Sequence, residues 1–281
     1  MNYQWYPGHM TKAKRMMQED LKLIDLVIEL LDARAPLSSR NPDIDELGKG
    51  KYRLLLLNKA DLADGESNKK WIDFFSEQGL AVQEINARVN GEMKGILQLV
   101  QNVCREKIER DRKRGIKNRP IRAMVVGIPN VGKSTFINSF AGRACAKTGN
   151  KPGVTKGKQW IRLSPSLELL DTPGILWPKF EDPAVGMKLA FIGSMNDQIL
   201  ILQELAQDLV NTLMKRYPGA IASRYGIVET NSDAAAILAD IARVRKCFLK
   251  GEELDYEKAS ALFLEDFRSG RLGKITLEDP Q

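Results

Sequence analysis

Residues 127–134, with the sequence GIPNVGKS, constrain this chain more than any other segment. They follow the apolar run IRAMVV at 121–126 and precede a helical pattern at 133–141. A loop of the form G-x-x-x-x-G-K-S in this context lets backbone N–H groups and a helix N-terminus surround phosphate. Gly127 and Gly132 permit the tight turn and the close approach. We expect Lys133 to reach the β- and γ-phosphates of a nucleotide and Ser134 to bind Mg²⁺.

Short apolar runs alternate with helical patterns over the first 177 residues. We expect strands at 25–32, 53–58, 81–85, 121–126, 159–163 and 168–171, and helices at 10–23, 66–78, 91–114 and 133–141. This alternation predicts an α/β fold with a mostly parallel sheet. Beyond residue 178 only helical patterns follow, at 184–215, 232–249 and 255–269. The sequence therefore predicts an α/β domain at 1–177 and a smaller all-α domain at 178–281.

Composition excludes several classes of protein. The longest apolar runs are shorter than ten residues, and the N-terminus has no apolar signal core, so we expect a cytoplasmic protein without a membrane span. The three cysteines are far apart and form no CxxC pair, which argues against a zinc ribbon or a disulfide framework. His9 is the single histidine, so a site with several histidine ligands is excluded.

The net charge of +7 is unevenly distributed. Residues 1–177 hold 30 basic and 20 acidic residues, whereas residues 178–281 hold 13 basic and 16 acidic ones. Nine basic residues fall within 105–122, and this stretch fits either a polyanion-binding surface or a solvated helix face. Six basic residues and no acidic one fall within 143–162, beside the predicted phosphate loop, which gives their charge a closer explanation.

Two further segments fit a nucleotide phosphate site. Asp171 ends the predicted strand SLELL and begins the tetrapeptide DTPG, so we expect its carboxylate to hold Mg²⁺ through water. Gly174 is then expected to offer its N–H to the γ-phosphate. Thr155, in KPGVT at 151–155, is the candidate for a second Mg²⁺ ligand. Taken alone, DTPG would be an ordinary turn and KPGVT a solvent loop.

The base specificity is read from residues 58–61, NKAD, which follow the strand pattern RLLLL. The Asp61 carboxylate can accept hydrogen bonds from guanine N1 and N2, whereas adenine offers no such pair of donors. We expect Asn58 to fix the loop and contact N7, and the stem of Lys59 to cover the ring. The N–H of Ala87, in NAR at 86–88, is expected to bind guanine O6. The full predicted nucleotide-binding set is Asn58, Lys59, Ala60, Asp61, Asn86, Ala87, Asn130, Val131, Gly132, Lys133, Ser134, Thr135 and Gly174.

The order of these motifs is NKAD, NAR, GIPNVGKS, KPGVT, DTPG, a circular permutation of the order in ordinary small GTPases. The set resembles the circularly permuted, TRAFAC-class GTPases. With WYPGHM at 5–10 and a helical C-terminal domain, the chain is similar to the ribosome biogenesis GTPase A family. The resemblance implies a circularly permuted P-loop GTPase domain and GTP hydrolysis. The implied partners are GTP, GDP, the precursor of the large ribosomal subunit and its rRNA, with action in late assembly. No DNA, no membrane and a monomer off the ribosome are expected.

The resemblance also bears on how hydrolysis works. Ile175 follows DTPG where Ras-like proteins place a water-orienting glutamine, so another group must act. His9, within WYPGHM, is the candidate for orienting water or stabilising charge, and the alternative is a structural or RNA-contacting histidine. In related GTPases an asparagine at the position of Asn130 accompanies K⁺ coordination, and the alternative is a residue that only fixes the loop.

The helical domain is expected to respond to the nucleotide state. The permutation places it directly after DTPG, so a change at the γ-phosphate is expected to bias its position. It is similar to RNA-binding antiterminator-type domains, and the candidate RNA contacts are Lys215–Arg216 and the cluster Arg243, Arg245 and Lys246. Exposed charge for solubility explains either cluster equally well. A different class of protein also fits, a signalling switch whose helical domain binds a protein effector without RNA.

Overall fold

A six-stranded sheet forms the centre of the α/β domain in the computed structural model of the chain, which describes residues 18–116, 119–142, 159–171, 182–228 and 233–280. The strand order is β3-β2-β1-β4-β6-β5. The strands are β1 (Leu26–Asp32), β2 (Tyr52–Asn58), β3 (Ala81–Ile85), β4 (Ile121–Val126), β5 (Gln159–Ser164) and β6 (Leu167–Asp171). All neighbouring pairs are parallel except β5 with β6. The predicted mostly parallel sheet is confirmed, with strand ends shifted by at most one residue.

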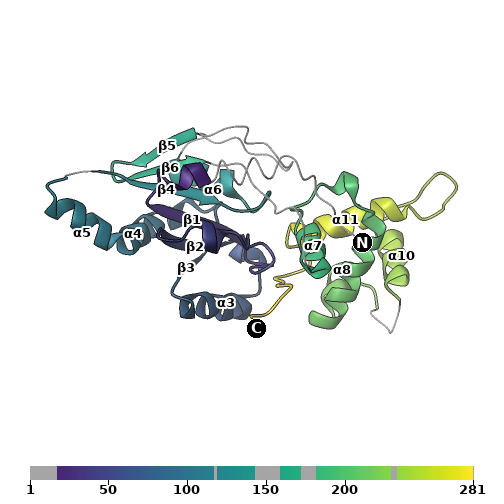
Figure 1. Cartoon of the computed structure of the whole chain (residues 1–281). Helices are drawn as coiled ribbons and strands as arrows, with labels where there is room; N and C mark the ends of the chain where they lie inside the picture. The colour runs from purple at the N-terminus through teal and green to yellow at the C-terminus, as the bar shows by residue number, and fades with distance from the viewer. Residues whose placement is uncertain (1–17, 117–118, 143–158, 172–181, 229–232, 281) are drawn as a thin grey trace.

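Both faces of the sheet are covered, which explains the uninterrupted leucines of β2. Leu54 and Leu56 belong to one hydrophobic cluster with α4 (Met93–Val103) and α6 (Lys133–Ala141). Leu55 and Leu57 face the other way and cluster with Trp71 of α3 (Gly65–Glu77). Figure 1 shows α3 below β3, whereas α6 lies near β4 and β6. Parallel strands buried on both faces read as continuous apolar runs.

Several helices differ from the predicted ones because backbone breaks interrupt the periodic pattern. The predicted helix 91–114 is divided at buried Cys104 into α4 and α5 (Arg105–Lys113). The predicted helix 184–215 is divided into α7 (Pro183–Phe191) and α8 (Leu202–Arg216), because Gly193 takes a left-handed conformation with φ 77°. The short 3-10 helix η3 (Asp197–Ile199) lies between them.

The part of the chain that the structure describes also contains two helices that the sequence did not predict, and one predicted helix is shorter than expected. Helices α2 (Ile44–Leu47) and α9 (Ala220–Tyr225) were not predicted. The predicted helix 232–249 is replaced by α10 (Ala234–Val244), after which the chain turns, and α11 (Tyr256–Arg268) matches the last predicted helix. Most of the predicted helix 10–23 lies outside the described residues.

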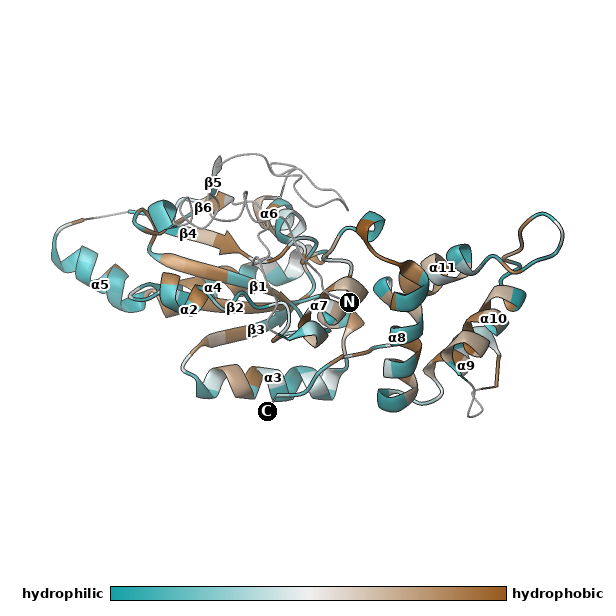
Figure 2. Cartoon of the chain, turned by 45° about the vertical axis from the view of Figure 1, so that its right-hand side comes forward, coloured by the Kyte–Doolittle hydropathy of each residue, from teal (hydrophilic) through white to brown (hydrophobic). Residues whose placement is uncertain are grey.

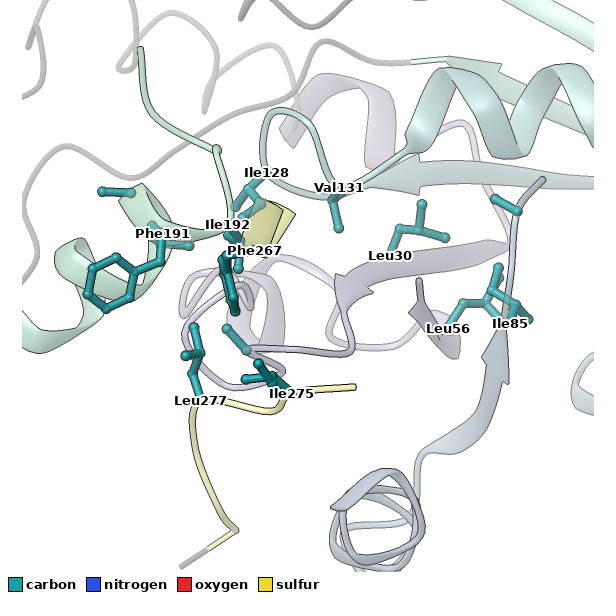
Figure 3. Packing of buried hydrophobic residues seen from close by; sticks show 14 of the residues in the cluster. Leu30, Leu56, Ile85, Ile128, Val131, Phe191, Ile192, Phe267, Ile275 and Leu277 are labelled. Carbon is teal, nitrogen blue, oxygen red and sulfur yellow. The ribbon is translucent and has the colours of Figure 1, made fainter. Parts of the chain in front are cut away.

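Helices α7 to α11 gather at one end of the sheet (Figure 1). The segment after α11 then returns to the α/β domain, where the N–H of Ile275 donates to Leu62 O at 3.0 Å and that of Leu277 donates to Arg34 O at 2.7 Å. We call residues 274–279 the C-terminal tail. Figure 3 shows Ile275 and Leu277 of this tail in the cluster that also contains Phe267 of α11. One continuous apolar core therefore joins the two parts of the chain.

Among the helices that lie in the described part of the chain, none combines the length and the apolar character needed to cross a bilayer.

Candidate nucleotide site

The predicted nucleotide motifs meet at the carboxyl edge of the sheet. β4 leads into the loop 127–132, β2 ends at Asn58 and β3 ends immediately before Asn86. These strands are parallel and belong to one sheet, so the loops that follow them emerge at the same edge. Ligands of open α/β sheets bind at this edge.

Glycines shape the phosphate loop where a side chain would not fit. Gly132 stands immediately before α6 with φ 102°, and a Cβ there would overlap Nδ2 of Asn58. A Cβ at Gly127 would lie 2.6 Å from the carbonyl oxygen of Leu30. The buried Lys133 donates from Nζ to the carbonyl oxygens of Gly127 and Ile128, both at 2.9 Å. The ammonium group thus lies against the loop that is predicted to hold phosphates.

Asn58 connects three motifs that are far apart in the sequence. Its Nδ2 donates to Val131 O of the phosphate loop at 2.7 Å, and its Oδ1 accepts from the N–H of Ala87 at 3.0 Å. The side chain is buried, so both contacts are protected from water. The side chain of Asn58 therefore links the phosphate loop to the loop after β3. Because the Ala87 N–H donates to Asn58 here, its predicted contact with guanine O6 stays a prediction, as does the contact of Asn58 with N7.

Lys59 sits in a buried ionic cluster at the end of β1. Its Nζ lies 2.8 Å from Oδ2 of Asp32 and donates to Asn130 O at 2.9 Å. Arg34 donates from Nε and Nη2 to the same Asp32 carboxylate, at 2.9 and 2.8 Å. Burial alone would raise the pKa of Asp32, but the charges and hydrogen bonds of Arg34 and Lys59 outweigh it and hold this pKa far below its ordinary range. Burial lowers the pKa of Lys59, and Asp32 opposes that effect.

The phosphate loop also contacts the helical part of the chain. Asn130 has a left-handed backbone with φ 60°, and its Nδ2 donates to Gly193 O, after α7, at 2.7 Å. Arg34 donates from Nη1 to Arg268 O at the end of α11, at 3.1 Å. Figure 3 shows Ile128 and Val131 of the loop near Ile192 of the helical part. Two loops of the candidate site thus hydrogen-bond directly to the helical part.

The remaining predicted residues are partly placed. Asp61 is exposed in the 3-10 helix η1 (Ala60–Leu62), and Ser134 and Thr135 are half-buried in the first turn of α6. Asp171 ends β6 and pairs in register with Val125, so its backbone lies beside the strand that leads into the phosphate loop. Serine hydroxyl and aspartate carboxylate groups offer oxygen atoms, and Mg²⁺ prefers oxygen ligands. His9, Thr155, Gly174 and Ile175 lie outside the described residues.

Asp32, Arg34 and Gly193 were not predicted as site residues from the sequence. Asp32 and Arg34 could have been found in the same way as Asn58, because they are polar residues at the end of a buried strand. Gly193 carried no local signal, because its contact with Asn130 joins residues 63 positions apart.

Comparison with known proteins decides the family. Residues 122–240 match the family described as 50S ribosome-binding GTPase. The chain is 49% identical to ribosome biogenesis GTPase A of Bacillus cereus, with 100% of this chain and 95% of that protein aligned. The chain belongs to the ribosome biogenesis GTPase A family. The Thermotoga maritima member is 34% identical over 99% of this chain and 94% of its own. The bovine protein named mitochondrial ribosome-associated GTPase 1 is also 34% identical, over 98% of this chain and 88% of its own.

Solved structures agree with this family assignment. GNP-bound YlqF from T. maritima is 30% identical and superimposes with a TM-score of 0.69, over 96% of this chain and 99% of that one. GDP-bound YlqF gives 0.70 at 29% identity, over 95% and 99%. The predicted fold, a circularly permuted P-loop GTPase domain followed by a helical region, is confirmed, as are the predicted family and the assignment of this chain as a GTPase.

Proposed function

We propose that this GTPase binds the precursor of the large ribosomal subunit through its rRNA and promotes late maturation of the particle. The observation that carries the nucleotide part is the side chain of Asn58, which joins the phosphate loop to the loop after β3. The names of the relatives, ribosome biogenesis GTPase A and mitochondrial ribosome-associated GTPase 1, support the ribosomal part. The excess of basic residues over residues 1–177 supports an RNA partner.

In this proposal each motif has a chemical role. Lys133 neutralises the β- and γ-phosphates, and Asp61 selects guanine. Mg²⁺ is held by Ser134 and Thr155, with Asp171 acting through water. The metal supplies positive charge beside the phosphates. The partly buried first turn of α6, with its hydroxyl oxygen, supports this ligand set.

We propose further that His9 orients the attacking water and that the amide oxygen of Asn130 contributes to a K⁺ site. The hydrophobic Ile175 after DTPG supports a role for His9, because this position lacks a glutamine. The contact of the Asn130 amide nitrogen with Gly193 would make any K⁺ site sensitive to the position of the helical part.

The proposal extends to the domain organisation of the chain and to its place in the cell. We propose a GTPase domain at 1–177 and an RNA-binding helical domain at 178–281, with the C-terminal tail bound across the GTPase domain. The tail contacts already described support this arrangement. The protein acts in the cytoplasm, as a monomer when it is off the ribosome, and binds neither DNA nor membranes.

Co-sedimentation with particles isolated from cells tests the ribosomal role. The full-length protein should sediment with precursors of the large subunit when it holds a non-hydrolysable GTP analogue. Rising salt should release it with a steep log–log slope, because phosphate contacts release counterions. Failure to sediment with any ribosomal particle would contradict the proposal and favour a protein effector instead.

A further inference from the structure

A hairpin joins α10 to α11 at the end of the helical part. We call residues 243–254 the α10–α11 hairpin. Its backbone is fixed by Leu249 N–H donating to Glu253 O at 2.8 Å, by a bridge between Phe248 and Leu254, and by Asp255 N–H donating to Cys247 O at 2.9 Å. In Figures 1 and 2 it projects beyond α10 and α11, on the side away from the sheet.

This hairpin exposes apolar side chains although it is well ordered by hydrogen bonds. Phe248 is 45% exposed, and Val244 and Leu249 are about half exposed as well. Cys247, between them, is buried against Ala242 and Ala259, so the base of the hairpin is packed while its outer residues face water. Apolar residues that gather on a surface, rather than being scattered singly, mark an interaction site.

The same hairpin is basic within a region that is otherwise acidic. Arg243, Arg245, Lys246 and Lys250 lie between Ile241 and Gly251, and no acidic residue does. All four are exposed, and the pair formed by Arg243 with Asp240 is also at the surface. Glu252 and Glu253 follow only on the returning strand. Exposed cations close in sequence to an exposed aromatic ring complement phosphates and bases, not an apolar protein surface.

Arg216, one member of the other basic cluster of the helical part, is engaged within the molecule. Arg216 pairs with Asp279 at 2.7 Å and donates from Nε to Thr276 O at 3.2 Å. It therefore holds the C-terminal tail. Of the two clusters predicted from the sequence, the hairpin is the one that combines exposed basic side chains with an exposed aromatic ring.

We propose that the α10–α11 hairpin binds an unpaired segment of RNA. Phe248 stacks on a base, while Arg245, Lys246 and Lys250 contact the phosphates on either side. An unpaired segment is required because duplex RNA does not offer its base faces for stacking. This inference rests on the proposed function, since it names the form of RNA that the helical domain of this GTPase recognises.

The test measures anisotropy of the full-length protein with labelled oligouridine of about ten nucleotides, a length within the span of known single-strand sites. Phe248→Ala should weaken binding about 5- to 150-fold, the range for loss of one base stacked on an aromatic ring. Phe248→Trp should retain the affinity. Ile201→Ala is the matched control, because Ile201 is an exposed apolar residue of the same helical region. Arg245→Gln with Lys246→Gln should reduce the log–log salt slope by about 1.4.

Several outcomes would overturn the inference. Unchanged oligouridine binding by Phe248→Ala removes the stacking role, and stronger binding to a duplex of equal length than to oligouridine removes the unpaired form. Loss of particle binding by Phe248→Ala without loss of oligouridine binding assigns the hairpin to a protein. If the wild type sediments with ribosomal particles and the hairpin variants bind particles and oligouridine as well as the wild type does, only the hairpin inference fails. If the wild type binds neither particles nor oligouridine, the proposed function fails together with the hairpin inference.

Discussion

Replacement of Asp32 by asparagine tests whether the buried ionic cluster at the end of β1 stabilises the folded protein. The Asp32 carboxylate is fully buried and accepts from Arg34 and Lys59. Asparagine preserves the shape but removes the charge and turns an NH₂ group toward cationic donors. Buried Arg34 is then left without a counter-charge. We expect the free energy of unfolding to fall by about 3–5 kcal/mol, the cost of breaking a buried ion pair.

Asp45→Asn supplies the matched control. Asp45 also lies between two arginines, with Arg40 at 2.6 Å and Arg53 closer still, but its side chain is 57% exposed. Water and salt screen such a pair, so its loss should cost no more than about 1 kcal/mol. Urea unfolding of both variants, followed by far-UV circular dichroism at neutral pH, gives the comparison.

The pH dependence provides a second criterion for Asp32→Asn. The pKa of Asp32 is lowered in the folded protein, whereas an unfolded aspartate titrates near 3.9. The stability contributed by Asp32 is therefore complete above about pH 4 and is lost as pH falls toward the folded pKa. The difference in the free energy of unfolding between the wild type and Asp32→Asn should become smaller at acid pH. Equal costs for the Asp32 and Asp45 variants, or a constant difference down to acid pH, would refute the buried-charge reasoning.

Three further predictions concern the nucleotide site. Lys133→Ala should abolish GTP turnover without unfolding the protein, and a folded variant with wild-type turnover would remove Lys133 from the phosphate site. Asp61→Asn should weaken GTP binding and let xanthosine nucleotides compete, because the paired acceptors for guanine N1 and N2 are lost; a nucleotide titration checks this. His9→Ala should lower single-turnover hydrolysis by roughly 10²–10⁴-fold, with nucleotide affinity almost unchanged. Full turnover of that variant with large-subunit particles present would assign His9 a structural role.

Local sequence pattern was enough to place the strands and the phosphate loop. The apolar runs of β1 and β2 end in polar residues, and the period of a strand is set by adjacent residues. GIPNVGKS fixes its own backbone through Gly127 and Gly132, and the order of the motifs shows the permutation. Signals of this kind are contained within a few neighbouring positions, so they can be read without knowing the fold.

Tertiary structure alone decided which residues hold these loops and how far the helices extend. The side chain of Asn130 meets Gly193 O across 63 positions, and that of Arg34 meets Arg268 O across 234, because packing of the helical part brings these carbonyl groups to them. No periodic pattern encodes such a contact. The turn after Val244 could not be predicted from the sequence either, because Phe248 stands where a continuing helix would place its next apolar residue. Hydrogen bonds between segments that are distant in the chain settle these features, and they exist only once the core has formed.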